Sequence, residues 1–463
     1  MNDQNWNRRK ILKTMGAFAL GSMVANPGFT ARRVNKIIPL SINYPTINPG
    51  KPVTVIVIGA GNRGWGAYSS YGLKFPDELK VVGVAEPIPY RRERISKAFN
   101  IPPENQFTTW EYVFEKPKFA DALFITTPDD LHYGPAMAGL KMGYHLLLEK
   151  VIAQSWEQCN DILKMTEKTG SIVAVCHVLR YSPYFRKLKE IAGSGEIGNI
   201  VSIQHLEPVE HIHMSHSFVR GNWGNSKKSN PMILSKSCHD TDILRWIIEK
   251  PCTRVSSFGS LTLFRAENAP EGSTLRCTDG CKVERDCPYS AKKIYLEKRT
   301  WLYHLNLEEV NDQTILRELK NGPYGRCVYH CDNDVVDHQV CNFEFEGQVT
   351  ASFSMEGLTD YAGRRTRIFG TLGDVIGDEN TLTVSQFATG IQETWDASKA
   401  AEIDSGHGGG DWGLVHDFLR AVSLNDPGIL SSTIQVSMAS HLMGFKAEES
   451  RLSGKVEELY PRL

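Results

Sequence analysis

The 463-residue sequence has no surplus of charge of either sign, because Lys and Arg total 52 and Asp and Glu total 53. A nucleic-acid partner or an anionic membrane surface calls for a basic surplus, so the composition favours neither. The sequence also has no internal repeat and no low-complexity tract. Its 41% hydrophobic and 23% charged residues are typical of a folded globular protein. The length predicts two domains, and a small molecule is the expected partner.

No apolar run in the sequence is long enough to span a bilayer. The run from Met15 to Ala25 follows a twin arginine, Arg8-Arg9, and stops at Asn26-Pro27-Gly28. This pattern predicts an export signal of the twin-arginine type and a periplasmic protein, or a cytoplasmic one if the signal is not used. The alternative is a basic, partly amphipathic N-terminal helix. Residues 1–50 are assigned to the signal and a linker.

Short apolar segments alternate with helical patterns between residues 51 and 180. Val53–Ile58 is a continuous apolar run, as expected for a parallel strand that is buried on both faces. The other predicted strands are Leu79–Ala85, Ala122–Thr126, Tyr144–Leu148 and Ile172–Cys176, and the helices between them include Pro89–Phe99, Ala136–Met142 and Trp156–Thr169. This alternation predicts βαβ units and an α/β Rossmann domain.

The pattern changes after residue 180. Strand-like segments separated by long polar loops occur at Ile200–His205, Arg254–Phe264, Gln339–Phe345 and Val349–Met355, and helices close the chain at Trp412–Val422 and Thr433–Ser450. Residues 181–463 are therefore predicted to form an α+β domain with a large, mostly antiparallel open sheet.

A glycine turn, Gly59-Ala60-Gly61-Asn62-Arg63-Gly64, follows the first strand directly and opens a predicted helix. In this context Gly59 allows the tight turn, Gly61 lets the backbone approach a pyrophosphate, and Gly64 permits close packing of helix and strand. The helix N-terminus then stabilises the phosphate charge. The pattern predicts that this turn, Asn62 and Arg63 included, binds a dinucleotide; a glycine-rich turn without a ligand is the alternative.

Glu86 stands at the end of the second predicted strand. An acid at this position bonds the adenosine ribose hydroxyls and repels a 2′-phosphate, which favours NAD over NADP. Arg91 and Arg92 follow closely and weaken this preference.

Two further motifs lie at strand ends: Thr127-Pro128-x-x-x-His132 and Glu149-Lys150. Together with the glycine turn, they resemble the glucose–fructose oxidoreductase / inositol dehydrogenase (Gfo/Idh/MocA) family from about residue 51 onward. The resemblance implies a Rossmann domain, an open-faced sheet domain and an active site between them. It also implies hydride transfer between NAD(P) and a carbon that bears a sugar or cyclitol hydroxyl, and a homo-oligomer formed through the exposed sheets.

The resemblance places Lys150 at the cofactor and at the reacting hydroxyl, where an ammonium can stabilise a developing alkoxide. This chain has Val151 where the family has proline. The family's second catalytic segment, Asp-x-x-x-His-x-x-Asp, matches at His239 and Asp242, whereas Ser235 replaces the first acid. His239 is the expected general base, with Asp242 setting its tautomer. The alternative to a catalytic role is that this segment is a helix N-terminus, where the acids only complement the helix dipole.

Other residues are candidates for substrate contacts. His177, Arg180 and Tyr181 follow the last Rossmann-type strand, where interdomain packing is an alternative role. Lys236 adds a cation beside His239, and His407 lies in a glycine run that resembles a flexible cap.

Acids and histidines crowd the segment from Glu207 to His216. The alternate spacing of His211 and His213 would put both on one strand face. A metal site is therefore one interpretation of this segment. A polar, sugar-facing wall is preferred, with Trp223 stacking on a sugar ring.

Three cysteines lie close together at Cys277, Cys281 and Cys287. They are candidate ligands of a structural zinc, with Cys327, His330 or Cys331 as the fourth, although the spacing is not a standard zinc-knuckle pattern. Disulfides or three reduced thiols are the alternatives.

Two enzyme classes remain open. The first is an NAD-dependent oxidoreductase that acts on a secondary hydroxyl of a sugar or glycoside. The second is an NAD-dependent glycosidase that oxidises the ring transiently, eliminates the aglycone and adds water. The sequence lacks a Tyr-Pro-Thr-His segment that the best-known such glycosidases would carry. A non-catalytic sugar-binding protein is disfavoured because Lys150, His239 and Asp242 are all present.

Overall fold

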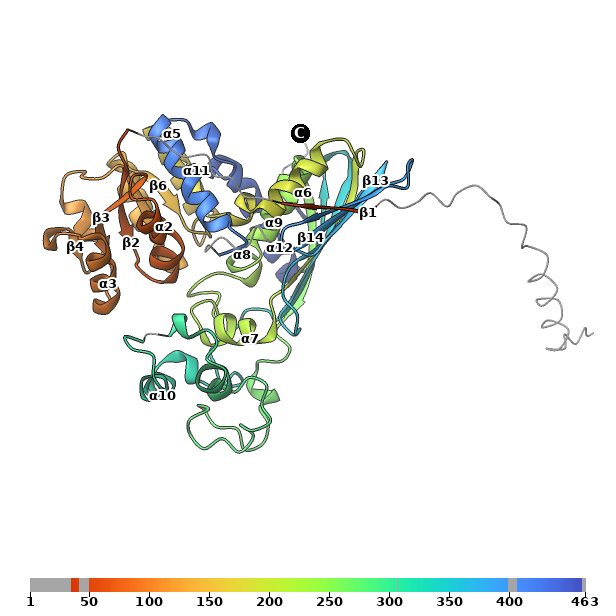
Figure 1. The fold of residues 1–463 in the computed structure, drawn as a ribbon. Coiled ribbons are helices and arrows are strands. Elements are labelled where there is room, and N and C mark those ends of the chain that lie inside the picture. Colours follow the sequence, from red (N-terminus) through yellow and green to blue (C-terminus); the bar gives the residue numbers. More distant parts are fainter. Residues whose placement is uncertain (1–34, 41–49, 306, 399–405, 460–463) are drawn as a thin grey trace, which may run out of the picture.

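The computed structural model describes residues 35–40, 50–305, 307–398 and 406–459, and Figure 1 shows their arrangement. The predicted twin-arginine signal and most of the linker lie outside the described residues. Within the described ranges, no helix has the length and apolar character needed to cross a membrane.

The first domain is built on a parallel sheet with the strand order β4-β3-β2-β5-β6-β7. Its strands are β2 (Val53–Ile58), β3 (Leu79–Ala85), β4 (Gln106–Phe107), β5 (Ala122–Ile125), β6 (His145–Leu148) and β7 (Val173–Val175). The strand order reverses between β2 and β5, and in such a sheet a ligand binds outside the carboxyl ends of the strands at this switch point. The predicted Rossmann fold is confirmed.

Helices cover both faces of this sheet (Figure 1). They are the helical segment Asn62–Ser69 with α2 (Ser70–Lys74), α3 (Pro89–Phe99), α4 (Tyr133–Lys141), α5 (Trp156–Thr169) and α11 (Gly410–Leu424). Helix α11 comes from the far end of the chain, and its Phe418 packs edge-to-face on Phe124 of β5, with ring centroids 6.1 Å apart. Residues assigned from the sequence to the second domain therefore complete the core of the first.

The second domain contains a ten-stranded sheet with the order β1-β15-β14-β13-β12-β8-β11-β10-β9-β16. The strands are β1 (Asn35–Pro39), β8 (Ile200–Pro208), β9 (Cys252–Ser260), β10 (His338–Phe345), β11 (Val349–Glu356), β12 (Arg365–Gly370), β13 (Gly373–Gly377), β14 (Thr381–Gln386), β15 (Gln392–Asp396) and β16 (Glu457–Glu458). Only the β8–β11 and β1–β15 pairs are parallel, so the predicted mostly antiparallel sheet is confirmed.

One face of the large sheet is covered by helices α6 (Pro183–Gly193), α9 (Cys238–Ile248) and α12 (Ile434–Ser453) (Figure 1). Along its strands, buried residues such as Val255 and Phe343 alternate with exposed ones such as Phe258 and Val340. This period-2 pattern means that the opposite face is not covered by the described chain.

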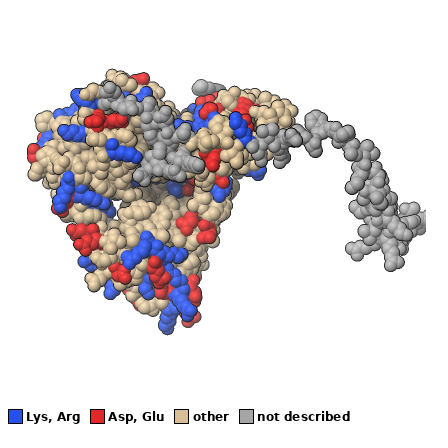
Figure 2. Space-filling view, in the orientation of Figure 1, with Lys and Arg blue, Asp and Glu red and all other residues tan. Residues whose placement is uncertain are grey.

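Residues 261–337, between β9 and β10, form a separate lobe that we call the insertion. It contains α10 (Asp312–Asn321) and a small core of its own, which includes Tyr295, Ile315 and Leu319. Asn311 caps α10, because its side chain accepts a hydrogen bond from the backbone N–H of Thr314. Figure 2 shows the surface hollowed between the Rossmann domain and the insertion, with charges of both signs around it.

The glycine turn meets the spatial demands of its sequence pattern. Gly59 has a φ of +92°, and a Cβ atom there would lie 2.8 Å from the carbonyl oxygen of Thr126. A Cβ atom at Gly64 would lie 2.0 Å from the carbonyl oxygen of Gly59. A Cβ atom at Gly61 would lie 3.6 Å from a guanidinium nitrogen of Arg91, its nearest neighbour. That face of the turn is therefore open to a ligand.

We predict that Gly64→Ala lowers the free energy of unfolding by about 3 kcal/mol and abolishes NAD binding, because the added methyl overlaps the backbone of the turn. Urea denaturation and calorimetric NAD titration measure the two effects. Gly193→Ala is the control, since a Cβ atom there meets nothing within 4 Å. Equal stability of the two variants would contradict the packing role of Gly64.

Candidate active site

Glu86 lies buried at the end of β3, beside the glycine turn. Its carboxylate accepts hydrogen bonds from the backbone N–H of Ala60 at 2.7 Å and of Ile88 at 2.9 Å. Arg92 donates to the backbone carbonyl of Glu86, and Arg91 stands over Gly61. The acid that the sequence assigns to the ribose hydroxyls is therefore fixed at the turn by backbone contacts. Asn62 is exposed at the same turn.

The loop after β5 is tied to the end of β6 by the buried His132. Its Nδ1 lies 2.6 Å from the carbonyl oxygen of Val151, and its Nε2 lies 3.0 Å from that of Thr127. Thr127 is half-buried and Pro128 is exposed, so both are accessible at the carboxyl ends of the strands.

Arg63 of the glycine turn joins two distant carboxylates. Its Nε donates to Glu149 at 2.6 Å, and its two terminal nitrogens contact Asp411 of α11 at 2.8 and 3.1 Å. The Tyr68 hydroxyl donates to Glu149 at 2.6 Å. Burial raises the pKa of Asp411, but the charges of Arg63 and His407 outweigh burial and leave that pKa below its usual range. Arg63 thus fixes the turn to the end of β6, one residue before Lys150.

Lys150 lies where the Rossmann domain meets α8 (Met232–Ser235). Its Nζ donates to the carbonyl oxygen of Ser235 and lies 5.8 Å from the ring centroid of Trp223. The Lys150–Val151 peptide bond is cis.

Four imidazole rings lie close together near this lysine, those of His177, His239, His407 and His441. The His441 ring lies 5.4 Å from that of His177, between centroids. The His239 ring lies 6.0 Å from that of His177 and 5.9 Å from that of His407, between centroids. His239 Nδ1 and both ring nitrogens of His177 are buried without a hydrogen-bond partner in the described structure. Buried polar atoms normally find partners, so these nitrogens fit a polar ligand such as a hydroxyl.

Burial holds these imidazoles in the neutral form. It lowers the pKa of His177 to about 3, with the charge of Lys150 among the further causes. Burial likewise lowers the pKa of His239 well below its ordinary value, and Lys150 is the next largest cause. A neutral imidazole is able to accept a proton, which is the state a general base needs.

Asp242 contacts Arg180 and not His239. The guanidinium donates to both carboxylate oxygens, at 2.6 and 2.7 Å, and the Ser440 hydroxyl adds a bond of 3.1 Å. His177 Nε2 lies 3.7 Å from the same carboxylate. Asp242 is therefore placed to position Arg180 and His177.

Arg180 and Tyr181 use their polar atoms inside the protein. Arg180 also donates to the carbonyl oxygen of Ser431, and the Tyr181 hydroxyl lies 2.8 Å from that of Ser432. These contacts agree with a role of Arg180 and Tyr181 in packing between the domains, which was the alternative to substrate binding.

Lys236 forms an ion pair with Glu207 at 3.0 Å. The sequence analysis missed the charges beneath it: Arg364 contacts Glu207 at 2.9 Å and Asp240 at 2.6 Å, and His205 lies 2.9 Å from Asp240. Asp240 belongs to the same motif as His239. Its partners His205, from β8, and Arg364, from the segment just before β12, are distant in the sequence, so the motif's spacing could not predict these contacts.

His407 precedes α11 and is oriented by Asp411, whose carboxylate lies 3.0 Å from His407 Nδ1. The His407 side chain is 37% exposed, so its ring is accessible at the cleft. Asp411 was also missed, although its place four residues after His407 at a helix start was an available sequence indication.

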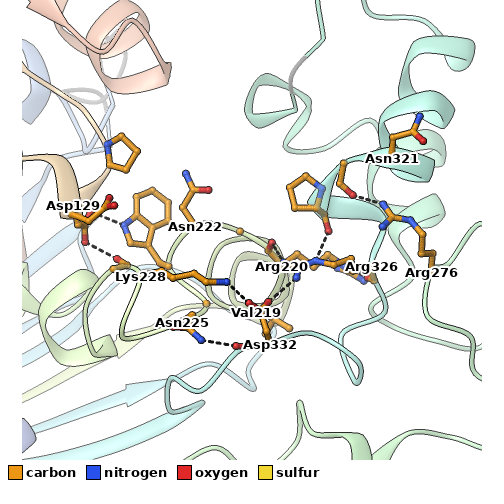
Figure 3. Close-up of a pocket in the computed structure, with 18 residues that line it drawn as sticks. Asp129, Val219, Arg220, Asn222, Asn225, Lys228, Arg276, Asn321, Arg326 and Asp332 are labelled. Atoms are coloured by element: carbon orange, nitrogen blue, oxygen red, sulfur yellow. Dashed lines mark hydrogen bonds and ion pairs between the residues drawn. The ribbon is translucent and has the colours of Figure 1, made fainter. Parts of the chain in front are cut away.

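A cavity of about 480 Å³ adjoins this centre (Figure 3). The loop after β5, the segment after Arg220 and the insertion line it, and Trp223 lies on its wall. The Trp223 indole N–H donates to Asp129 at 3.0 Å, which fixes the ring.

The prediction that His211 and His213 lie on a strand is wrong. These residues form a helical turn, α7 (His211–His213), that continues into the helical segment Met214–Arg220. His216 stacks on Tyr324 with centroids 4.5 Å apart, and burial lowers its pKa to about 2. The side chains pack in an aromatic cluster and do not share one strand face.

The zinc expected at Cys277, Cys281 and Cys287 finds no support. These cysteines and Cys327 line one small cavity in the insertion, but among the described residues no group of three or more His, Cys, Asp or Glu is placed to hold a metal ion. All ten cysteines are free.

Comparisons with known proteins identify both domains. A family described as "Oxidoreductase family, NAD-binding Rossmann fold" matches residues 53–177, and "GFO/IDH/MocA C-terminal domain" matches residues 185–376. The Bacillus subtilis oxidoreductase YteT is 24% identical over 312 residues, which are 64% of this chain and 71% of that protein.

More distant matches include proteins whose names state a substrate. The scyllo-inositol 2-dehydrogenase (NAD+) of Bacillus subtilis is 26% identical over 216 residues, 45% of this chain and 58% of that protein. The solved structure of a levoglucosan dehydrogenase in complex with NADH and levoglucosan has a TM-score of 0.63 at 16% identity, covering 89% of this chain and 100% of that chain. At this identity the likeness is one of fold.

We predict that Asp242→Asn lowers the free energy of unfolding by about 3 to 5 kcal/mol, because it leaves the buried Arg180 charge without its carboxylate. Glu93→Gln is the control: Glu93 pairs with Lys97 at the surface, where the two side chains are 61% and 75% exposed, so we expect no measurable change in this free energy. Urea denaturation compares the two. Similar losses in both variants would show that the Arg180–Asp242 pair has no special structural role.

Proposed function

This chain belongs to the Gfo/Idh/MocA oxidoreductase family, and we propose that it oxidises a secondary hydroxyl of a sugar or glycoside with NAD. The observation that carries the proposal is the Lys150 ammonium beside neutral imidazoles whose buried nitrogens lack partners. The substrates named for the inositol and levoglucosan dehydrogenases support a carbohydrate.

The residues at the glycine turn fit a dinucleotide, since Gly61 leaves the turn open and Glu86 stands beside it. Bound NAD would supply the hydride acceptor. Lys150 then holds the oxygen of the reacting hydroxyl and stabilises the negative charge that develops on it. His239 takes the hydroxyl proton, because burial and the lysine charge keep its ring neutral. Asp242 acts through Arg180 and His177 as a positioning residue.

A second candidate function is an NAD-dependent glycosidase that oxidises the ring transiently. Such a cycle needs a second proton-transfer group for the leaving aglycone. His407 favours this candidate, because its ring is accessible, oriented by the Asp411 carboxylate and 5.9 Å from that of His239. The missing Tyr-Pro-Thr-His segment argues against it.

We predict that Lys150→Met lowers the turnover number by a factor of about 10² to 10⁴ while NAD still binds, since the ammonium acts on the substrate oxygen. The assay mixes protein, NAD and a panel of monosaccharides and aryl glycosides, and follows nicotinamide absorbance and released aglycone separately. Lys141→Met, at an exposed position of α4, is the control and should behave as wild type.

The two readouts separate the candidate functions. Stoichiometric NADH without cleavage supports the oxidoreductase, and aglycone release without net NADH supports the glycosidase. Wild-type turnover in Lys150→Met, or no change in either readout across the panel, would refute the proposal.

Two further proposals concern location and assembly. We propose export to the periplasm, supported by the twin arginine Arg8-Arg9 and the apolar run after it. We also propose a homo-oligomer that covers the open face of the large sheet, where Phe258, Val340 and Ile376 are exposed.

A further inference from the structure

We propose that the cavity between the Rossmann domain and the insertion binds the part of the carbohydrate that lies beyond the oxidised ring. The preferred substrate is then a glycoside of two or more rings and not a free monosaccharide. This inference rests on the proposed function, and it assigns a role to the insertion. The lining does not include Lys150, His239 or Asp242, so the cavity is an addition to the catalytic centre.

The cavity borders the catalytic centre at Trp223. The indole ring lines the cavity, and it also lies 5.8 Å from the Lys150 ammonium. Its N–H is bonded to Asp129, in the loop that follows Pro128 at the cofactor cleft. A ligand that reaches from Lys150 past this ring therefore enters the cavity.

The opposite wall comes from the insertion. Asn321, Gly322, Pro323 and Arg326 line the cavity on this side, and Pro128–Asp130 line it on the Rossmann side. Figure 3 shows Asn321 and Arg326 across the opening from Asp129. At about 480 Å³ the cavity falls within the usual range of small-molecule sites. It has room for a group beyond the one that Lys150 and His239 hold.

The polar groups of the wall favour a neutral, hydroxyl-rich ligand. The Asp129 carboxylate is bonded to Trp223, Ser229 and Asn230. The Asp332 carboxylate is paired with Lys228 and Arg326, so two of the three acids in the wall already have partners. A ligand with a strong charge of its own would disturb these pairs, whereas sugar hydroxyls can bond to them.

Asn222 is a neutral polar side chain of this wall that is left for a ligand, in addition to the exposed Asp130 carboxylate. It is exposed, it makes no hydrogen bond with any other described residue, and Figure 3 shows its amide directed into the opening. An amide offers a donor and an acceptor, which suits a sugar hydroxyl. Because Asn222 has no protein partner, its replacement tests ligand binding without disturbing the fold.

The test compares Asn222→Leu with wild type and with Asn380→Leu, a control at an exposed turn position between β13 and β14. The probes are cellobiose, lactose and maltose against glucose and galactose, with NAD present in excess. Tryptophan fluorescence titration measures binding without turnover, and NADH absorbance measures kcat/KM.

In wild type we expect at least one disaccharide to bind about tenfold more tightly than its component monosaccharide. Asn222→Leu should lower this ratio about tenfold, which is ~1.4 kcal/mol, and leave monosaccharide binding unchanged. Equal binding of all probes in wild type, an unchanged ratio in Asn222→Leu, or equal weakening of both sugar classes would overturn the inference.

Failure of the subsite and failure of the proposed function are distinguishable. Disaccharide binding that depends on Asn222 without NADH or bond cleavage supports the subsite and refutes the function. Oxidation of a monosaccharide without any disaccharide advantage supports the function and refutes the subsite.

Discussion

The ion pairs of Arg63 with Glu149 and Asp411 are the constraint on which the site depends. They join three segments that are far apart in the chain: the glycine turn, the end of β6 and the start of α11. Glu149 directly precedes Lys150, and Asp411 also holds His407. One guanidinium therefore fixes the cofactor turn, the proposed catalytic lysine and the accessible imidazole relative to one another. The Glu149 and Asp411 carboxylates are buried, and a buried charge is destabilising when its partner is removed.

The chemistry follows from the balance of charge around the imidazoles. The charge of Lys150 acts on both His177 and His239. Arg180 acts on His177 and also binds Asp242, the carboxylate that lies 3.7 Å from the His177 ring. Burial and these cations keep the rings neutral, which is the protonation state from which a general base acts. The Trp223 ring borders both this centre and the cavity beside the insertion.

The sequence predicted the Rossmann domain closely because its strands are continuous apolar runs: β2 and β3 have the predicted bounds. In contrast, β12 to β15 were not predicted, since half-buried strands alternate with polar residues and resemble loops. The family motifs predicted that Lys150 and His239 belong to the same site. It could not find Asp411 as the partner of Arg63, because the two are 348 positions apart. The strand expected at His211 failed because two alternating histidines also fit one helical turn.

Hydride transfer from the sugar is the event that both candidate functions share, and a rapid-quench isotope experiment tests it most directly. Protein, NAD and glycosides deuterated at the ring carbons are mixed and quenched within one turnover, and the nicotinamide is analysed by mass spectrometry. The account predicts deuterium on the nicotinamide with wild-type protein and none with His239→Asn. Product formation by the wild type without any deuterium on the nicotinamide would contradict it.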